Sequence, residues 1–302
     1  MNRKQFLKSQ MGKEKVVLSP QESETYLQTI RRRFKRHKLA MISCVLLAVL
    51  VLAAVVVPFF YPYDPAETVG GFSQAPSMQH WLGTDQIGRD QLSRLLHGTR
   101  ISLLVGIMAA GVSTVVGVVL GLISGFFGGV VDMVIMRITD AIMSFPYVLL
   151  VLVAASIFEP GLWTIIFILG LVDWPGVARL VRGNVLSLRE SNFVKSSQLS
   201  GMPRRYLLFS DILPNTIAPV LVYATSVVAL SILDEAALSF LGMGIQLPTP
   251  SLGNMLNGAE NLSILTGKPW LWVPPGLVII LLVVAINFIG DALRDALDPT
   301  ST

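Results

Sequence analysis

The residues that could do chemistry are few and scattered in this sequence. The three histidines, His37, His80 and His97, have no helical spacing that would make two of them ligands of one metal ion. The single cysteine, Cys44, lies in an apolar run, so an intrachain disulfide is excluded. Ser144 and the other hydroxyl groups of the apolar segments have no evident base, which disfavours an intramembrane protease. We therefore predict a non-catalytic chain without a metal site.

The chain also has no loop of the kind that cradles nucleotide phosphates. Gly267 and Lys268 are followed by Pro269, and Leu262 stands where such a loop requires its first glycine. The chain is therefore not its own ATPase, and we expect it to bind no cofactor.

Three acidic residues, Asp173, Asp234 and Glu235, fall inside or near the edge of long apolar segments. Such side chains are costly in a bilayer and face protein or water rather than lipid. They line a pathway or pair with arginines, and pairing is the favoured interpretation. The candidate partners are Arg89, Arg94 and Arg100. A proton relay, and with it a secondary transporter, is disfavoured because no matching acids recur in the other apolar segments.

The composition indicates that membrane helices position these residues. Of 302 residues, 53% are hydrophobic and 14% are charged, and the mean hydropathy is +0.65. Soluble domains carry about 25% charged residues. A soluble fold could not hide this much apolar surface, whereas a bilayer requires it. The basic pI of about 9.3 could suggest nucleic acid as a partner, but the positions of the charges argue against it.

Six apolar segments are predicted to cross the membrane. At about 1.5 Å rise per residue, segment 39–60 spans the hydrocarbon core, and it is too long for the apolar part of a signal peptide. The third span could begin as early as Val130, in which case Pro146 would kink it. The predicted spans are 39–60, 101–124, 141–158, 162–179, 216–241 and 271–289.

The positions of lysine and arginine predict the orientation. All but four of the 23 lie on one predicted side, and the exceptions are Arg89, Arg94, Arg100 and Lys268. Both termini and the polar loop are therefore predicted to be cytoplasmic, with the basic run 31–38 anchoring the first span on anionic lipid. The predicted plan is a basic tail (1–38), a first helix (39–60), an extracellular segment (61–100), a five-helix core (101–290) with a polar loop at 183–215, and a cytoplasmic C-terminus (291–302).

Residues 190–214 form a polar, basic stretch between two apolar segments. Gly201 separates two helix-compatible stretches, and Pro203 falls at the start of the second. This pattern predicts a helix–turn–helix, here called the elbow, on the membrane surface. A polar island in so apolar a chain indicates a surface that another protein reads.

Gly117, Gly121 and Gly125 follow one another at intervals of one helical turn and so share one face. Small residues let membrane helices approach closely, because apolar burial alone gives helices little attraction inside lipid. The three glycines predict a tight seam, within this chain or against a partner, and the alternative is generic flexibility near a membrane exit. The segment 125–129 predicts a short cytoplasmic turn.

Two further stretches lie on the predicted outer side. In the first, residues 83–85 and 88–90 predict turns, Asp85 or Asp90 is a candidate helix cap, and the alternating charges predict internal salt bridges. In the second, Gly and Pro residues close a helix and open a long loop. A loop of this length is a plug, a docking surface or a solvated connector.

Both outer stretches resemble one known family. LGTDQIGRDQLSRLLHGTRISL (82–103) and EAALSFLGMGIQLPTPSLGNML (235–256) look like blocks of the C-type permease subunits of dipeptide, oligopeptide and nickel ABC importers. MRITDAIMSFP (136–146) and residues 29–65 also resemble that family, so the likeness covers about residues 30–298. The elbow resembles its ATPase-docking loop: Gly201, Leu213 and Pro214 are in register, but Lys195-Ser196-Ser197 replaces Glu-Ala-Ala and Asp211 replaces Ile.

The resemblance implies an all-α membrane protein with six transmembrane helices and the type I ABC importer permease fold, in a bacterial or archaeal cell membrane. It implies half of a translocation pathway for peptides. The implied partners are a second homologous permease subunit, two ATP-binding subunits that hold ATP and Mg²⁺, and an extracellular substrate-binding protein.

Site residues are also carried over by position from the resemblance. The implied ATPase-coupling residues are Arg189, Glu190, Phe193, Lys195, Gly201, Pro203 and Arg204. The implied extracellular gate or binding-protein contacts are Asp85, Arg89, Asp90, Gln246, Pro248 and Pro250. Lys195 in place of the family glutamate predicts an altered ionic partner on the ATPase or reliance on apolar contacts.

Three alternatives stay open at the level of sequence. A nickel or metal-chelate importer keeps the same scaffold, because a permease need not coordinate the complex that it lets pass. A stand-alone channel or secondary carrier would need ion-selective rings or coupled charges, and would leave the polar elbow without a purpose. An intramembrane enzyme is the weakest candidate.

Overall fold

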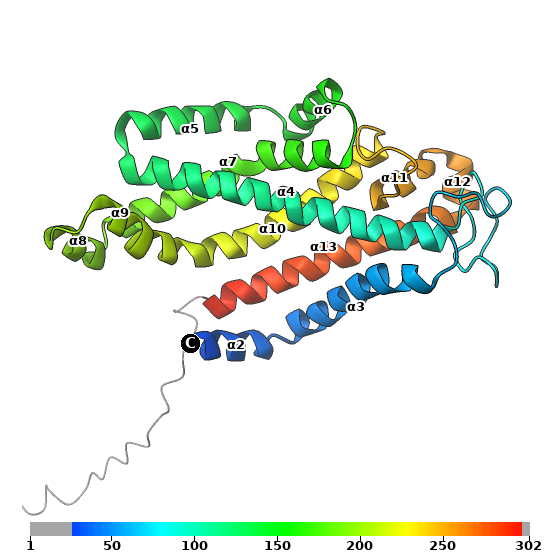
Figure 1. Ribbon diagram of the computed structural model, residues 1–302, viewed down its shortest axis with the longest axis horizontal. Coiled ribbons are helices and arrows are strands. Elements are labelled where there is room, and N and C mark those ends of the chain that lie inside the picture. Colours follow the sequence, from blue (N-terminus) through cyan, green and yellow to red (C-terminus); the bar gives the residue numbers. More distant parts are fainter. Residues whose placement is uncertain (1–25, 298–302) are drawn as a thin grey trace, which may run out of the picture.

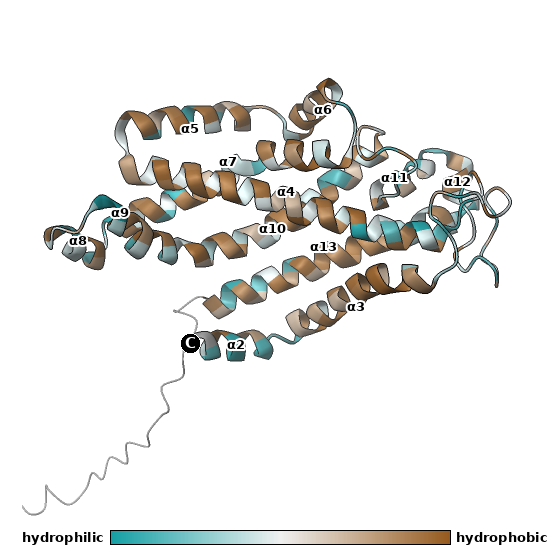
Figure 2. Ribbon diagram, in the orientation of Figure 1, coloured by the Kyte–Doolittle hydropathy of each residue, from teal (hydrophilic) through white to brown (hydrophobic). Residues whose placement is uncertain are grey.

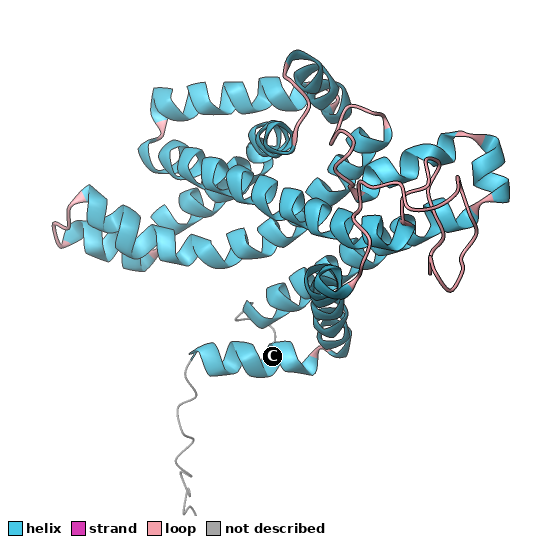
Figure 3. Cartoon of the chain, turned by 45° about the vertical axis from the view of Figure 1, so that its right-hand side comes forward, coloured by secondary structure: helices cyan, strands magenta, loops and turns pink. Residues whose placement is uncertain are grey.

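The computed structural model describes residues 26–297, and their regular structure is helical apart from two isolated β-bridges (Figure 1; Figure 3). The helices are α2 (Tyr26–Arg36), α3 (Lys38–Phe60), α4 (Gln91–Phe127), α5 (Gly129–Ser144), α6 (Tyr147–Ile157), α7 (Leu162–Arg189), α8 (Asn192–Leu199), α9 (Arg204–Tyr206), the π-helix η1 (Leu207–Ile212), α10 (Leu213–Phe240), α11 (Leu252–Leu256), the 3₁₀ turn η2 (Asn257–Glu260), α12 (Leu262–Gly267) and α13 (Pro269–Leu297). Residues 1–25 of the predicted tail and 298–302 of the predicted C-terminus lie outside the described part.

Five helices of the described chain are long and apolar enough to cross a membrane: α3, α4, α7, the continuous run Arg204–Phe240, and α13. The sixth candidate is the pair α5 and α6, which passes the same criterion only together and is bent by 93°. The break falls at Phe145 and Pro146. Phe145 is extended (φ −88°, ψ 144°), as expected before a proline, so the helix cannot continue through it. The predicted kink at Pro146 is thus a complete break.

Several helices extend beyond the apolar segments that predicted them. Helix α4 begins at Gln91 rather than at residue 101, and α7 runs to Arg189 rather than to residue 179. The backbone amide of Ser93 donates to the side chain of Asp90 at 2.8 Å, so Asp90 is the N-cap that the sequence predicted as one of two candidates. Figure 2 shows why hydropathy missed the start of α4: this helix is hydrophobic along most of its length and hydrophilic near its N-terminal end.

The glycine seam lies inside this chain, between α4 and α7, which run side by side in the same direction (Figure 1). A Cβ atom at Gly121 would lie 2.6 Å from the carbonyl oxygen of Ala178 and 2.7 Å from the Cβ of Val181. At Gly125 it would lie 2.8 Å from the Cβ of Val185, and at Gly117 it would overlap Val177. The prediction of a tight seam is confirmed, and its partner is a helix of the same subunit.

The described ends of the chain lie together at one end of the helix bundle. Helix α2, the end of α13 and the elbow gather there (Figure 1; Figure 3). Helices α11 and α12 lie at the other end, together with the loops of residues 61–90, and these loops are here called the cap. His37 and Asp295, 3.1 Å apart, tie the junction of α2 and α3 to the end of α13. This placement agrees with the predicted common side of the termini and the elbow; which side is cytoplasmic stays a prediction.

The intramembrane acids do not pair with arginine in the described chain, and this part of the prediction is wrong. Glu235 is fully buried and accepts hydrogen bonds from the hydroxyls of Ser102 and Ser239, both at 2.7 Å. Asp234 lies near Tyr147. Serine hydroxyls supply the donors that a buried carboxyl needs, and two of the candidate arginines are engaged with Asp85 instead.

The loop between α10 and α13 is folded onto the bundle and is not a solvated connector. Gly242 (φ +77°) ends α10, and α11 then packs against α4, α10 and α13. The side chain of Ser251 accepts from the amide of Asn254, whose own side chain accepts from the amide of Ser251, so the first turn of α11 is capped in both directions. Leu252 is fully buried.

Candidate functional site

The elbow has the predicted helix–turn–helix geometry. Helix α8 ends at Leu199, and Gly201 takes the left-handed conformation (φ +78°). The amide of Gly201 donates to the carbonyl of Gln198 (3.0 Å) and that of Met202 to the carbonyl of Ser197 (3.2 Å), which is the Schellman pattern of a glycine-terminated helix. Pro203 immediately precedes the first residue of α9, as predicted.

One face of the elbow is fixed to the bundle. Val194, Leu207 and Ile212 are buried, and Val194 and Ile212 belong to the same apolar cluster as Val181 and Val185 of α7. The seam valines and the elbow therefore share one packed apolar cluster. The attachment makes the elbow a rigid part of the bundle rather than a flexible loop.

The opposite face of the elbow exposes large apolar side chains. Phe193 is 46% exposed, Leu199 90% and Phe209 62%, and Met202 and Tyr206 are also exposed. These five lie within one short polar segment at the end of the bundle. A concentrated apolar surface of this kind, set among charged residues, is typical of a protein docking site.

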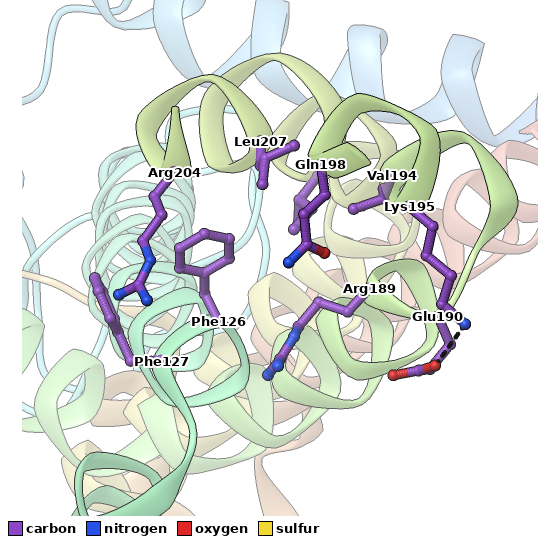
Figure 4. A pocket seen from close by; sticks show the side chains of 10 residues that line it. Phe126, Phe127, Arg189, Glu190, Val194, Lys195, Gln198, Arg204 and Leu207 are labelled. Atoms are coloured by element: carbon purple, nitrogen blue, oxygen red, sulfur yellow. Dashed lines mark ion pairs between the residues drawn. The ribbon is translucent and has the colours of Figure 1, made fainter. Parts of the chain in front are cut away.

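The charged residues of the elbow form a rim around a groove of about 270 Å³ (Figure 4). Lys195 donates to Glu190 at 2.8 Å, and this contact lowers the pKa of the Glu190 carboxyl. Arg189 donates to the carbonyl oxygen of Gly125 at 2.9 Å, at the C-terminal end of α4. Both members of the Glu190–Lys195 pair are at least half exposed, so a partner protein can reach them.

Arg204 also lines this groove, together with residues that the sequence did not single out. Phe126 and Phe127 were predicted as part of a turn, but α4 continues through both, and the chain turns at Gly128 (φ +67°) and Gly129 (φ +56°). Their rings pack edge to face and form one wall of the groove beside Arg204 (Figure 4). Gln198 of α8 points into it as well. The sequence feature that could have revealed this wall is a Phe-Phe pair at a predicted turn on the same side of the membrane as the elbow.

In the cap, the predicted internal salt bridges are present. The Asp85 carboxylate accepts from Arg89 Nε at 2.7 Å and lies 3.4 Å from Arg94 Nε, and it also accepts from two backbone amides. All three side chains are nearly buried. The turns before them depend on Gly83 (φ +74°) and Gly88 (φ +85°).

A second group of polar contacts in the cap surrounds the carboxylate of Asp90. Beyond capping α4, its carboxylate lies 2.8 Å from Nδ1 of His80 and accepts from the hydroxyl of Tyr61 at 3.2 Å. Burial, followed by the Asp90 charge, raises the pKa of Tyr61. Asp90 is completely buried.

The predicted gate or binding-protein contacts are therefore of two kinds. Asp85, Arg89, Asp90 and Pro250 are buried within the chain, whereas Gln246 and Pro248 are exposed on the loop after α10. The structure brings the first three together but does not test their contact with a partner, which stays a prediction.

Comparison with known proteins decides the family. Residues 117–301, more than half of the chain, match the family model described as the binding-protein-dependent transport system inner membrane component. Residues 25–78 match the N-terminal TM domain of oligopeptide transport permease C. The chain belongs to this family of transport permeases. As a C-type permease it is a multi-pass protein of the bacterial membrane, in agreement with its long apolar helices.

Relatives of this permease match over nearly their whole length. A protein named as a peptide permease in Brucella suis biovar 1 (strain 1330) is 44% identical, over 88% of this chain and 89% of the relative. The oligopeptide transport system permease protein OppC of Haemophilus influenzae is 41% identical, over 92% and 90% of the two chains. The dipeptide transport system permease protein DppC of Bacillus subtilis is 40% identical, over 92% and 87%.

A solved structure shows the same fold for this permease. The crystal structure of an amino acid ABC transporter with histidines aligns with a TM-score of 0.53, at 12% identity, over 67% of this chain and 92% of that chain. At this identity the likeness concerns the fold alone. It agrees with the predicted type I ABC importer permease fold.

Proposed function

We propose that this permease forms half of the translocation pathway of an ATP-driven peptide importer and that the elbow is its joint with an ATPase subunit. The observation that carries the proposal is the two-sided construction of the elbow: one face is buried against α7, and the other exposes apolar side chains. Relatives named as peptide, oligopeptide and dipeptide permeases support peptides as the cargo class.

The mechanism follows from this construction. ATP binding and hydrolysis reside on two partner subunits, which hold ATP and Mg²⁺, and this chain binds no cofactor and catalyses no reaction. When the ATPases close, the elbow moves as a rigid body, and α7 and α4 move with it through the glycine seam. The pathway opens alternately to each side of the membrane against a second, homologous permease subunit, and an extracellular binding protein delivers the peptide.

The proposed coupling residues have distinct roles in this joint. Phe193 contributes apolar contact, and Gly201 and Pro203 shape the turn between the two helices. Arg189, Glu190, Lys195 and Arg204 supply the charged rim. At the far end, Gln246 and Pro248 are the exposed candidates for contact with the binding protein.

Substituting Gly201 with Val tests the joint. No atom lies within 4 Å of a Cβ at this position, so the constraint is the positive φ and not lack of space. A β-branched side chain in the left-handed conformation costs about 1–2 kcal/mol or more, so the turn reorganises. We expect Gly201→Val to insert normally but to lose peptide uptake together with the copurifying ATPases.

The matched control is Gly201→Asn, because asparagine tolerates the left-handed conformation. It should retain most uptake and ATPase binding. Full peptide uptake by Gly201→Val would contradict the assignment of the elbow as the joint. Uptake of nickel instead of peptide by the wild-type complex would keep the joint and replace the cargo.

A further inference from the structure

The groove beside the elbow has an excess of positive charge. Its lining contains three basic side chains, Arg189, Lys195 and Arg204, and a single acidic one, Glu190. Glu190 is already paired with Lys195 on the rim. Among residues 26–297 neither arginine forms an ion pair, although the charge of Arg189 also acts on Glu190.

The donors of both arginines are largely unused. Arg189 gives one hydrogen bond, to the carbonyl of Gly125, out of the five N–H donors of its guanidinium. The side chain of Arg204 has no hydrogen-bond or ion-pair partner among residues 26–297. Figure 4 shows the two side chains reaching toward the groove from different elements, Arg204 from α9 and Arg189 from the end of α7, with Phe126 between them.

Apolar side chains line the groove beside these charged ones. Phe126 and Phe127 form one side, and the buried Val194 and Leu207 also line it. An arginine beside a low-polarity wall makes stronger and more selective contacts with a carboxylate than an arginine in open water does. The groove is thus built to receive a negatively charged group that enters from outside the chain.

We propose that this groove receives the carboxylate of an aspartate or glutamate side chain from the ATPase subunit, held by Arg204 and Arg189. The inference rests on the proposed function. The exposed apolar side chains of Phe193, Leu199 and Met202 belong to the same elbow as groove-lining residues such as Gln198, so an ATPase surface that docks on the elbow lies close to the groove.

The charges of this contact also explain why a lysine stands at position 195. With Lys195 on the rim and two arginines inside, the permease side of the joint is positive, and the ATPase side is negative. Lys195 neutralises Glu190, which would otherwise repel the entering carboxylate. The lysine is therefore part of one consistent charge pattern rather than an isolated replacement.

The test compares Arg204→Glu with Arg205→Glu in the full transporter. Arg205 is the adjacent exposed arginine and does not line the groove, which makes it a matched control. The retention of ATPase subunits on the tagged permease is measured at increasing salt. We expect Arg204→Glu to reduce retention about tenfold or more and Arg205→Glu to change it less than about twofold.

A second measurement identifies the bound group. In an Arg204→Lys complex the positive charge is kept, and a carbodiimide joins the introduced amine directly to a carboxylate in contact with it. We expect a cross-linked peptide between position 204 and an aspartate or glutamate of the ATPase. The Arg205→Lys complex should give little of that product.

Each outcome is decisive. Equal retention by Arg204→Glu and Arg205→Glu overturns the proposal, and so does a cross-link only to this chain's own Glu190. If Arg204→Glu keeps its ATPases but loses copurifying anionic lipid, the occupant is a lipid headgroup and the proposal is wrong. If the wild-type permease carries no ATPase at all, it is the proposed function that fails, and this result is distinct from the other three.

Discussion

The cap and the elbow lie at opposite ends of the same helices and use their charged residues differently. In the cap, Asp85 and Arg89 are nearly buried and satisfy each other, with further bonds to backbone amides. In the elbow, the side chains of Glu190 and Lys195 are 75% and 50% exposed, and the side chain of Arg204 has no partner among the described residues. The cap is complete within this chain, whereas the elbow offers its apolar and cationic groups to another protein.

The two ends also differ in what a substitution should affect. Charges in the cap hold loops that have few helical hydrogen bonds of their own, so removing one should affect folding. Charges in the elbow are exposed on a segment that Val194 and Ile212 fix to the bundle, so removing one should affect association and leave folding unchanged.

The largest expected effect is that of Asp85→Ala on the free energy of unfolding. The substitution leaves Arg89 and Arg94 buried without their carboxylate, and breaking such a buried pair costs about 3–5 kcal/mol. The thermal unfolding midpoint in detergent, with tryptic cleavage in the cap, measures the loss.

Glu67→Ala is the control for Asp85→Ala, because Glu67 is an exposed acid of the same segment. It should leave both the midpoint and the cleavage unchanged. An unchanged midpoint for Asp85→Ala would show that the cap does not depend on its buried charges, and the contrast with the elbow would disappear.

The next largest effect concerns the seam that joins the two ends. Gly121→Ala forces a methyl group to within 2.6 Å of the Ala178 carbonyl, and such overpacking costs about 1–3 kcal/mol. Gly111→Ala is the matched control in the same helix, since no atom lies within 4 Å of its Cβ. Differential scanning calorimetry should show a lowered thermal midpoint for Gly121→Ala and an unchanged one for Gly111→Ala. Similar midpoints for the two variants would contradict the role of the seam as the mechanical link.

The smallest effect is expected for Lys195→Ala. An exposed ion pair contributes little to folding, so the thermal midpoint at neutral pH should not change. Because Lys195 lowers the pKa of Glu190, the contribution of the pair is present above the ordinary glutamate value of 4.5 and is lost as the pH falls through the lowered pKa.

Lys195→Ala should nevertheless weaken ATPase retention, and this is measured by copurification at increasing salt. In the substituted chain the pKa of Glu190 returns toward its ordinary value. A lowered thermal midpoint with unchanged ATPase retention would show that Lys195 stabilises the fold, as the charges of the cap do. The contrast between the cap and the elbow would then be wrong.

The positions of the helices could be predicted because they depend on long apolar runs. Their ends could not, since Gln91 and Arg189 are polar residues that hydropathy assigns to loops. In the structure Gln91 donates to the carbonyl of Leu271, 180 positions away in the sequence, and only the packed bundle supplies that partner.

For the site, the elbow was predictable because its signals are local: a glycine and a proline two residues apart between two helical patterns. The groove was not, because Phe126 and Arg204 come from elements 78 positions apart and meet only through the fold. The arginine partners predicted for Glu235 were wrong for the same reason. Charge in the sequence does not reveal that Ser102 and Ser239 already satisfy the carboxylate.

The seam between α4 and α7 also settles a question of alignment. Gly117, Gly121 and Gly125 face Val177, Val181 and Val185, and both sets repeat every four residues. Sliding one helix by a turn would restore two of these three pairs, so the repeat alone does not choose one alignment. Farther along, the order is reversed: Gly170 of α7 faces Val112 of α4.

A shift by one turn would not place another glycine of α7 opposite Val112. One turn of sliding would set Val112 against Trp174 in one direction or against Ile166 in the other, and both are large buried side chains. The four-residue repeat therefore allows the two helices to lie close, and one glycine on the opposite helix selects the register. Of the alignments that the repeat allows, the pair of Gly170 and Val112 permits only one.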